Sequence, residues 1–238
     1  MIYQGASMMR KLLIALSFVA AAASVAPLAA AEREVAFSRI GVSVNMEKTP
    51  YVEYKGTKID SYKTHSKNTH WAVIVVDYYP GMVRAGKADS KIAKSVRGGW
   101  IDDVTCEVSV EMPMDGSDKK STGLLTGKCT LWSVALDGKI HTLLMLIPPQ
   151  ILDRYMPLRG ASEFVAKASD FRVQVVFRDS NGSVLGEGYC NLNVKDDQGA
   201  AYFDKLRNGV VIKDAVLPRN KTPWAFHCFD RYDLLKSE

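Results

Sequence analysis

Hydrophobic and polar residues alternate along several short stretches of this chain. Apolar residues occupy every second position from Ile40 to Met46 and again from Val104 to Met112, where Cys106 is one of them. This period of two places one set of side chains on a buried face of a strand and the other set on an exposed face. The pattern therefore predicts half-buried antiparallel strands, with Cys106 on the apolar side.

Other stretches predict buried strands, hairpins and two helices. "HWAVIVVDYY" (70–79) is almost continuously apolar and rich in β-branched residues, which is typical of a buried strand. Asp137-Gly138 and Asn181-Gly182 each separate two apolar stretches and predict tight hairpins. "QGAAYFDKLRNG" (198–209) predicts a helix, "ILDRYM" predicts a helical turn, and the closing "PWAFHCFDRY" predicts a strand.

Short strands linked by hairpins predict a mainly β fold. We expect an immunoglobulin-like antiparallel β-sandwich with small helical insertions, formed as a single domain over residues 32–238. No fixed-period repeat or low-complexity linker divides the chain. Pro148-Pro149 is the one candidate break that would fit a two-domain protein.

The N-terminal stretch has the composition of an export signal. Arg10 and Lys11 precede an apolar run that ends in small residues, with Ala29 and Ala31 at the positions expected before a cleavage site. The apolar run is too short and too rich in alanine to span a membrane comfortably. We therefore predict a signal peptide over 1–31, no membrane segment after its removal, and a location in the periplasm, on the outer-membrane surface or outside the cell.

The charge balance changes this interpretation little. The chain has 31 basic and 26 acidic residues, a net charge of +5, and its basic residues are spread along the sequence. Nucleic-acid binding needs a concentrated basic surface, so we do not expect a nucleic-acid partner.

All four cysteines follow the expected signal peptide. They are Cys106, Cys129, Cys190 and Cys228. Export would allow disulfides to persist, and four cysteines permit three pairings. Pairing neighbours along the chain gives Cys106 with Cys129 and Cys190 with Cys228. Free buried thiols on strands are the alternative.

Few residue patterns suggest catalysis. His227 and Cys228 are adjacent, but neighbouring side chains on a strand point to opposite faces and do not form a dyad. The sequence contains no G-x-S-x-G, H-E-x-x-H or C-x-x-C motif. We predict no catalytic, cofactor-binding or metal-binding residues and expect a protein that is not an enzyme.

A polar, lysine-rich stretch over residues 47–68 contains three tyrosines. Tyr51, Tyr54 and Tyr62 are expected in a long loop. Exposed tyrosines beside lysines suit contact with a protein or a glycan. These three residues therefore form a candidate contact loop.

Three stretches together resemble a known group of proteins. The N-terminal segment, "GGWIDDVTCEVSV" (98–110) and "WAFHCFDRYDLL" (224–235) are similar to exported, immunoglobulin-like pilus-like proteins of mucin-associated verrucomicrobial bacteria, which occur with type IV pilus components. The resemblance implies a non-enzymatic envelope protein that acts in pilus adhesion or assembly. Its partners would be envelope or pilus proteins, glycans or a host surface.

One departure from pilins and three alternatives remain. Type IV pilins keep their apolar N-terminal helix, whereas this chain is expected to lose its only apolar helix, so it resembles an accessory subunit more than a fibre-forming pilin. Tryptophan and tyrosine content also fits a secreted glycan-binding module or a hydrolase. A periplasmic immunoglobulin-like chaperone with two domains is the third alternative.

Overall fold

The computed structural model describes strands, helices and turns that all lie within the compact unit Arg33–Glu238. The described residues are 37–50, 52–54, 57–59, 70–81, 96–113, 122–155, 167–192, 196–226 and 233–236. The expected signal peptide, and the loop residues Tyr51 and Tyr62, lie outside them.

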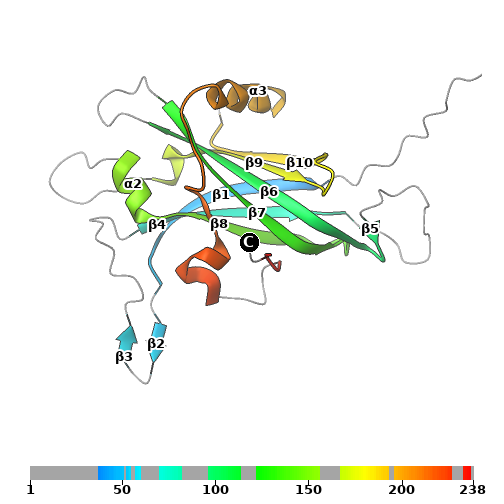
Figure 1. Ribbon diagram of the computed structural model, residues 1–238, viewed down its shortest axis with the longest axis horizontal. Helices are drawn as coiled ribbons and strands as arrows, with labels where there is room; N and C mark the ends of the chain where they lie inside the picture. Colours follow the sequence, from blue (N-terminus) through cyan, green and yellow to red (C-terminus); the bar gives the residue numbers. More distant parts are fainter. Residues whose placement is uncertain are drawn as a thin grey trace, which may run out of the picture. The chain divides into compact units, whose positions relative to one another are not determined.

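The described elements are mostly strands, as the alternation of apolar residues predicts (Figure 1). The strands are β1 (Ser38–Lys48), β2 (Val52–Tyr54), β3 (Thr57–Ile59), β4 (His70–Tyr79), β5 (Val96–Arg97), β6 (Trp100–Pro113), β7 (Thr122–Ala135), β8 (His141–Ile147), β9 (Arg172–Arg178), β10 (Val184–Cys190), β11 (Val211–Ile212) and β12 (Leu217–Pro218). The helices are α2 (Pro149–Tyr155) and α3 (Asp196–Arg207), with short 3-10 turns at Ala168–Asp170, Arg219–Lys221 and Pro223–Phe226.

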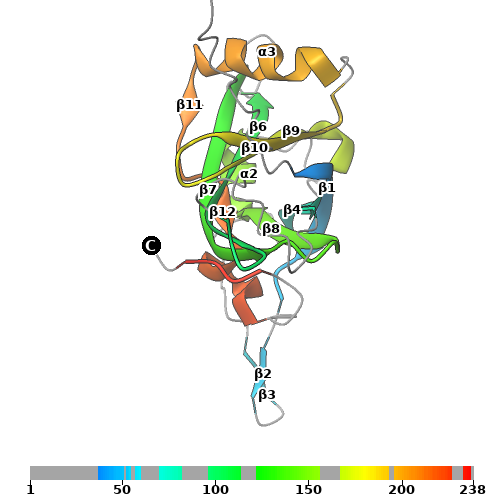
Figure 2. The same ribbon diagram turned by 90° about the vertical axis from the view of Figure 1, so that its right-hand side faces the viewer.

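Two sheets pack face to face around one core. The smaller sheet has the strand order β1-β4-β8-β12, and the larger has the order β10-β9-β6-β7-β11, with β5 beside β6. Figure 2 shows β1, β4 and β8 on one side and β6, β7 and β9 on the other. Side chains from both sheets, such as Ile74 and Val108, belong to the same buried cluster. The prediction of an antiparallel β-sandwich with small helical insertions is confirmed.

The alternating stretch of β6 faces the core as expected. Its apolar positions are all buried: Val104, Cys106, Val108, Val110 and Met112. Pairing in register along both sides of β6, with β7 and with β9, holds this strand at the centre of the larger sheet. The strand therefore supplies the middle of the core.

The continuous apolar run of β4 has a different explanation. Ile74 and Val76 face the core between the sheets, while Trp71 and Val73 lie on the outer face of the smaller sheet. Trp224 covers that outer face, with its ring centroid 5.2 Å from that of Trp71. Because β4 is buried on both faces, its sequence does not alternate.

The hairpin predicted at Asn181-Gly182 is confirmed, since β9 and β10 pair in antiparallel register, and both predicted helical segments are confirmed. The hairpin predicted at Asp137-Gly138 is wrong, because this turn carries the chain from β7 in the larger sheet to β8 in the smaller sheet. Gly138 and Gly182 adopt positive φ angles of 75° and 83° between the strands that they connect. α2 begins at Pro149, directly after β8 ends, and Gly209 follows α3 and donates to the carbonyl oxygen of Leu206 at 3.0 Å. Strands that follow Pro148-Pro149 in the chain pair with strands that precede it, as β9 does with β6. These prolines therefore do not separate two β domains.

The strand predicted over residues 223–232 is wrong where the structure describes it. Pro223–Phe226 is a 3-10 turn, and residues 227–232 lie outside the described part of the chain. The buried Arg219 donates to the carbonyl oxygens of Trp224 and Ala225, at 3.5 and 3.0 Å, and Ala225 donates to Thr222. These contacts fold the segment back on itself, which the local sequence pattern does not reveal.

One edge of the sandwich closes between β1 and β10. The backbone N–H of Phe37 donates to the carbonyl oxygen of Leu185 at 2.6 Å. A Cβ atom at Gly188 would lie 2.4 Å from Cγ2 of Ile40, so the absence of a side chain permits this close approach.

The opposite edge, along β7, is covered by two short segments. β11 pairs with β7 in parallel, with Val211 opposite Leu124. Further along, the segment 233–236 pairs in antiparallel register, with Leu235 opposite Leu131. We call residues 233–236 the C-terminal segment. The two segments occupy hydrogen-bonding positions that would otherwise form an open edge.

α3 covers the outer face of the larger sheet at one end (Figures 1 and 2). Phe203 is fully buried there and stacks with Tyr189 of β10. The Tyr202 hydroxyl donates to the buried carboxylate of Glu111 at 2.6 Å, and Arg172 donates to the same oxygen at 3.0 Å. Among the described helices, none combines the length and apolar character needed to cross a membrane.

Candidate functional site

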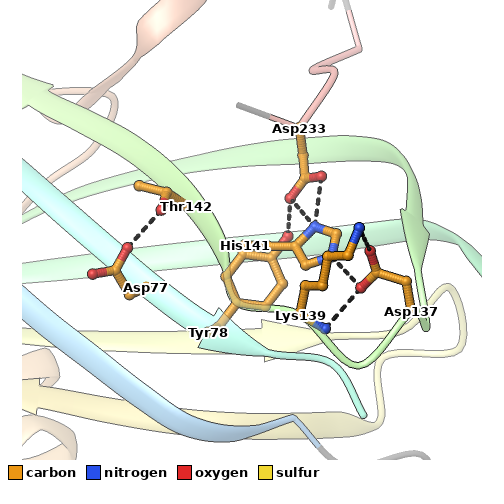
Figure 3. A network of polar contacts seen from close by, with 7 residues as sticks. All are labelled: Asp77, Tyr78, Asp137, Lys139, His141, Thr142 and Asp233. Carbon is orange, nitrogen blue, oxygen red and sulfur yellow. Dashed lines mark hydrogen bonds and ion pairs between the residues drawn. The ribbon is translucent and has the colours of Figure 1, made fainter. Parts of the chain in front are cut away.

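A cluster of titratable side chains lies at the end of the sandwich where β4, β8 and the C-terminal segment meet (Figure 3). Nδ1 of His141 lies 2.9 Å from Oδ1 of Asp233, and Nε2 lies 3.2 Å from Oδ1 of Asp137. The hydroxyl of Tyr78 donates to Oδ2 of Asp233. Each imidazole nitrogen therefore faces its own carboxylate. We call Tyr78, Asp137, His141 and Asp233 the His141 network.

The fold brings these four residues together from three places in the chain. Tyr78 and His141 are directly opposite each other in the β4–β8 pairing. Asp137 lies in the turn that leads from β7 into β8, where the N–H of Lys139 donates to its Oδ1 at 2.9 Å. Asp233 arrives with the C-terminal segment, 155 positions after Tyr78.

The surroundings shift the pKa values of three members. The hydrogen bond to Asp233 raises the pKa of His141, against the opposing effect of burial. Burial and the Asp233 carboxylate raise the pKa of the Tyr78 hydroxyl far above its ordinary value. For Asp137, partial burial acts to raise the pKa, but the hydrogen bonds from Lys139 and His141 outweigh it and lower the pKa. These shifts favour a charged imidazolium between two carboxylates.

This arrangement is suited to holding segments together rather than to acid–base chemistry. A protonated imidazole that donates from both nitrogens has no lone pair to accept a proton or to bind a metal. Tyr78 is fully buried, and its ring stacks on Phe37, 5.2 Å away between centroids. Within the described residues, no group of three or more His, Cys, Asp or Glu side chains could hold a metal ion.

Cys106 and Cys129 belong to the same core cluster as Tyr78. They are directly opposite each other in the β6–β7 pairing, and both side chains are buried. Burial, followed by the hydrogen bond to Cys129, raises the pKa of Cys106 well above its ordinary value. Both carry free thiols, as does the half-buried Cys190. Cys228 and His227 lie outside the described residues, so the pairing predicted for Cys190 and the strand geometry predicted for His227 stay predictions.

Three exposed apolar side chains lie on the outer face of the larger sheet and the C-terminal segment, since each directly precedes or follows a core-packed residue, Ile101, Leu131 or Leu235. Trp132 is 63% exposed, Leu234 is 56% exposed and Trp100 is 49% exposed. The N–H of Trp132 donates to the carbonyl oxygen of Leu234 at 2.9 Å, so these two residues are direct neighbours across strands. We call Trp100, Trp132 and Leu234 the aromatic patch.

Charged neighbours hold the Trp132 ring in place. Nζ of Lys236 lies over the ring, 4.9 Å from its centroid. The same ammonium forms an ion pair with Asp103, which has a positive φ angle of 58° in β6. A cation above an indole ring is attracted by the negative charge of its face. The most exposed member of the aromatic patch is therefore pre-positioned.

Sequence reasoning found only part of these sites. Tyr54, a member of the predicted contact loop, lies in β2, where the structure describes the backbone pairing with β3. The His141 network was missed, although Asp137 and His141 flank a recognisable Asp-Gly turn. The alternation along "LTGKCTLW" (125–132) could have indicated that Trp132 faces outward, on the face opposite the core-facing Leu131.

Comparison with known proteins identifies relatives at the level of family and fold. No curated protein sequence matches this chain significantly. A crystal structure of a protein from Akkermansia muciniphila is similar, with a TM-score of 0.55 and 14% sequence identity over 84% of this chain and 96% of that chain. At this identity the likeness is one of fold. A family model matches residues 28–238. The chain therefore belongs to this family of proteins.

Proposed function

We propose that this protein is an exported, non-enzymatic interaction protein of the cell envelope, associated with pili as an accessory, pilus-like subunit with an immunoglobulin-like sandwich. The family membership and the fold shared with the Akkermansia protein support this proposal, as does the composition of the N-terminal segment. The observation that carries it is the aromatic patch, which offers two tryptophans on one sheet face.

The aromatic patch has the properties of a protein-binding surface. Tryptophan is enriched among the residues that dominate binding energy in protein interfaces. Lys236 and Asp103 already hold the Trp132 ring, so a partner would restrict little additional side-chain motion on binding. Leu234 extends the apolar surface beside it, because it lies directly across from Trp132.

The His141 network supports the non-enzymatic part of the proposal. Its histidine is paired with a carboxylate at each nitrogen, and its tyrosine hydroxyl already donates to Asp233. A general base needs a free lone pair within reach of a substrate. The most strongly perturbed cluster in the described part of the chain is therefore occupied by its own internal contacts.

The test is a capture experiment with matched variants. The immobilised full chain would be exposed to envelope extract from a pilus-bearing host, as wild type, Trp132→Ala and Val184→Ala. Val184 is the matched control, since it is an exposed apolar residue (46% exposed) at the start of β10, which lies at the opposite edge of the larger sheet from β7. We expect wild type and Val184→Ala to recover the same pilus or surface component in similar amounts. Trp132→Ala should recover about a tenth of that amount or less.

Two outcomes would contradict the proposal. Recovery of no envelope component by the wild type would argue against an interaction role. Equal recovery by all three forms would show that the aromatic patch is not the binding surface. Turnover of an ester, peptide or glycoside substrate by the purified protein would contradict the non-enzymatic assignment.

A glycan-binding module is the second candidate, because an exposed indole face can pack on a sugar ring. Lys236 lies over the Trp132 ring and leaves at most one face open, which favours a protein partner. A glycan array probed with the same three forms separates the two. Glycan signals that disappear in Trp132→Ala and persist in Val184→Ala would favour the second candidate.

A further inference from the structure

Cys106 and Cys129 are placed as two halves of a cross-strand pair at the centre of the core. Their Cα atoms are direct partners in the antiparallel β6–β7 register, and the adjacent pairs on both sides, Thr105 with Thr130 and Glu107 with Lys128, continue the same register. Direct partners in an antiparallel pair have Cα atoms about 4.5–5.5 Å apart. Disulfide-bonded cysteines have Cα atoms about 4.4–6.8 Å apart. The Cα separation of such a pair therefore falls within the range that a disulfide spans.

The two side chains also project to the same face of the sheet, side by side. Both cysteines face the core, where Cys106 is fully buried and Cys129 almost so, and the two thiols are linked by a hydrogen bond. Cys190, the third described cysteine, lies on β10, and β9 and β6 separate β10 from β7. Among the described cysteines, Cys106 and Cys129 are the pair in direct contact.

We propose that Cys106 and Cys129 are a modification site that closes to a cross-strand disulfide and covalently joins β6 to β7. This inference rests on the proposed export, which would bring the chain into an oxidising compartment. One S–S bond forms between the two Sγ atoms, and each thiol gives up one proton and one electron. The disulfide of a thiol oxidase or of oxidised glutathione breaks and takes up those two electrons and two protons, becoming two thiols.

The burial of the pair determines when closure takes place. An oxidant cannot reach two sulfur atoms enclosed in the core of the folded sandwich. Closure therefore occurs while β6 and β7 associate and before the smaller sheet covers them. Once the core has formed, the same enclosure protects the bond from external reductant.

The test is to refold the denatured, reduced full chain in a buffer of reduced and oxidised glutathione. Remaining thiols would then be alkylated in denaturant, and the linked peptides would be identified by mass spectrometry. We expect a Cys106–Cys129 link in wild type and in Cys190→Ala, and loss of that link in Cys129→Ala. The oxidised wild type should resist reductant in the native state and become reducible in denaturant.

A stability comparison guards against variants that fold poorly. The oxidised wild type should have a higher urea midpoint than the same protein fully reduced, while Cys190→Ala should show the same difference between its oxidised and reduced forms. Alkylation of both Cys106 and Cys129 after oxidative refolding would overturn the proposal, as would a link from either of them to Cys190 or Cys228.

The same analysis of protein taken directly from the bacterial envelope separates this inference from the proposed function. A Cys106–Cys129 disulfide in the protein from the envelope supports both the modification site and export. A pair that closes readily in the glutathione buffer but is reduced in the native material would support the modification site and contradict export.

Discussion

The carboxylate of Asp233 accepts a hydrogen bond from the buried hydroxyl of Tyr78, which precedes it by 155 positions. The same carboxylate lies 2.9 Å from Nδ1 of His141. One side chain of the C-terminal segment thus supplies a partner for two groups on neighbouring strands of the smaller sheet. The attachment of this segment to the larger sheet, through β7, ties the two sheets together at this end.

Replacing Asp233 with asparagine should destabilise the protein. The amide oxygen can still accept from Tyr78, but the charge that balances His141 is lost in a place where its side chain is only 15% exposed. We expect a loss of about 1–3 kcal/mol in the free energy of unfolding, measured by urea denaturation. Asp204→Asn is the matched control, because Asp204 is 66% exposed in its ion pair with Arg207 and should change stability little. Equal losses in the two variants would contradict the role assigned to Asp233.

The dependence of stability on pH should include a contribution from His141. Its pKa is raised in the folded protein, so the stability that it contributes is fully present below its ordinary pKa, about 6.5, and is lost as pH rises through the raised folded value. Urea midpoints measured between about pH 5 and pH 9 should therefore fall more steeply for wild type than for His141→Gln. Parallel curves would contradict this assignment.

Asp137 should contribute at the acidic end of the same profile. Its pKa is lowered in the folded protein, so its stabilising effect is present above its ordinary pKa, about 3.9, and is lost as pH falls through the lowered value. Asp137→Asn should reduce the acid sensitivity of the urea midpoint below about pH 4, and should change the alkaline limb less than Asp233→Asn does, because Asp233 is the larger cause of the raised His141 pKa. A change of the urea midpoint confined to the alkaline limb would contradict the acid-side stabilisation assigned to Asp137.

The sequence predicted the sheets better than it predicted the polar cluster. Strict alternation in β6 identified every core-facing residue from Val104 to Met112, because strand side chains obey a period of two whatever their partners are. Asp137 and His141 share a recognisable turn. Asp233 could not be assigned to them, since its position depends on pairing between β7 and a segment far along the chain. The 3-10 turn at Pro223–Phe226 was missed for a related reason, as contacts from Arg219 determine it.

A substitution at Gly127 should disturb the covering of the β7 edge. A Cβ atom there would lie 1.8 Å from the carbonyl oxygen of Val216, and a backbone atom cannot move aside cheaply. We expect Gly127→Ala to lower stability by about 1–3 kcal/mol and to speed amide exchange at Ala215 and Val216, which donate to Thr126. In Gly41→Ala the nearest atoms would be 3.9 Å away, so this control should be close to neutral. Unchanged exchange in Gly127→Ala would contradict the close contact.

The anchoring of α3 can be tested at Tyr202. Its hydroxyl and Arg172 both donate to Glu111, which is 8% exposed. Tyr202→Phe should lower the free energy of unfolding by about 1 kcal/mol, since Glu111 keeps its bond from Arg172. Glu111→Ala removes the acceptor of both donors and should cost more than Tyr202→Phe. The opposite order in urea denaturation would contradict the role of Glu111 as the shared acceptor.

The long separation between Tyr78 and Asp233 also orders events in time. A ribosome makes Tyr78 and its three ring neighbours, Phe37, His141 and Phe177, before it makes the residue that accepts the tyrosine hydroxyl. A nascent chain that closed its sheets early would enclose that hydroxyl without a partner, at a cost of about 1–3 kcal/mol. Synthesis thus disfavours premature closure, and a chain that is transported before it folds reaches full stability only after Asp233 has arrived.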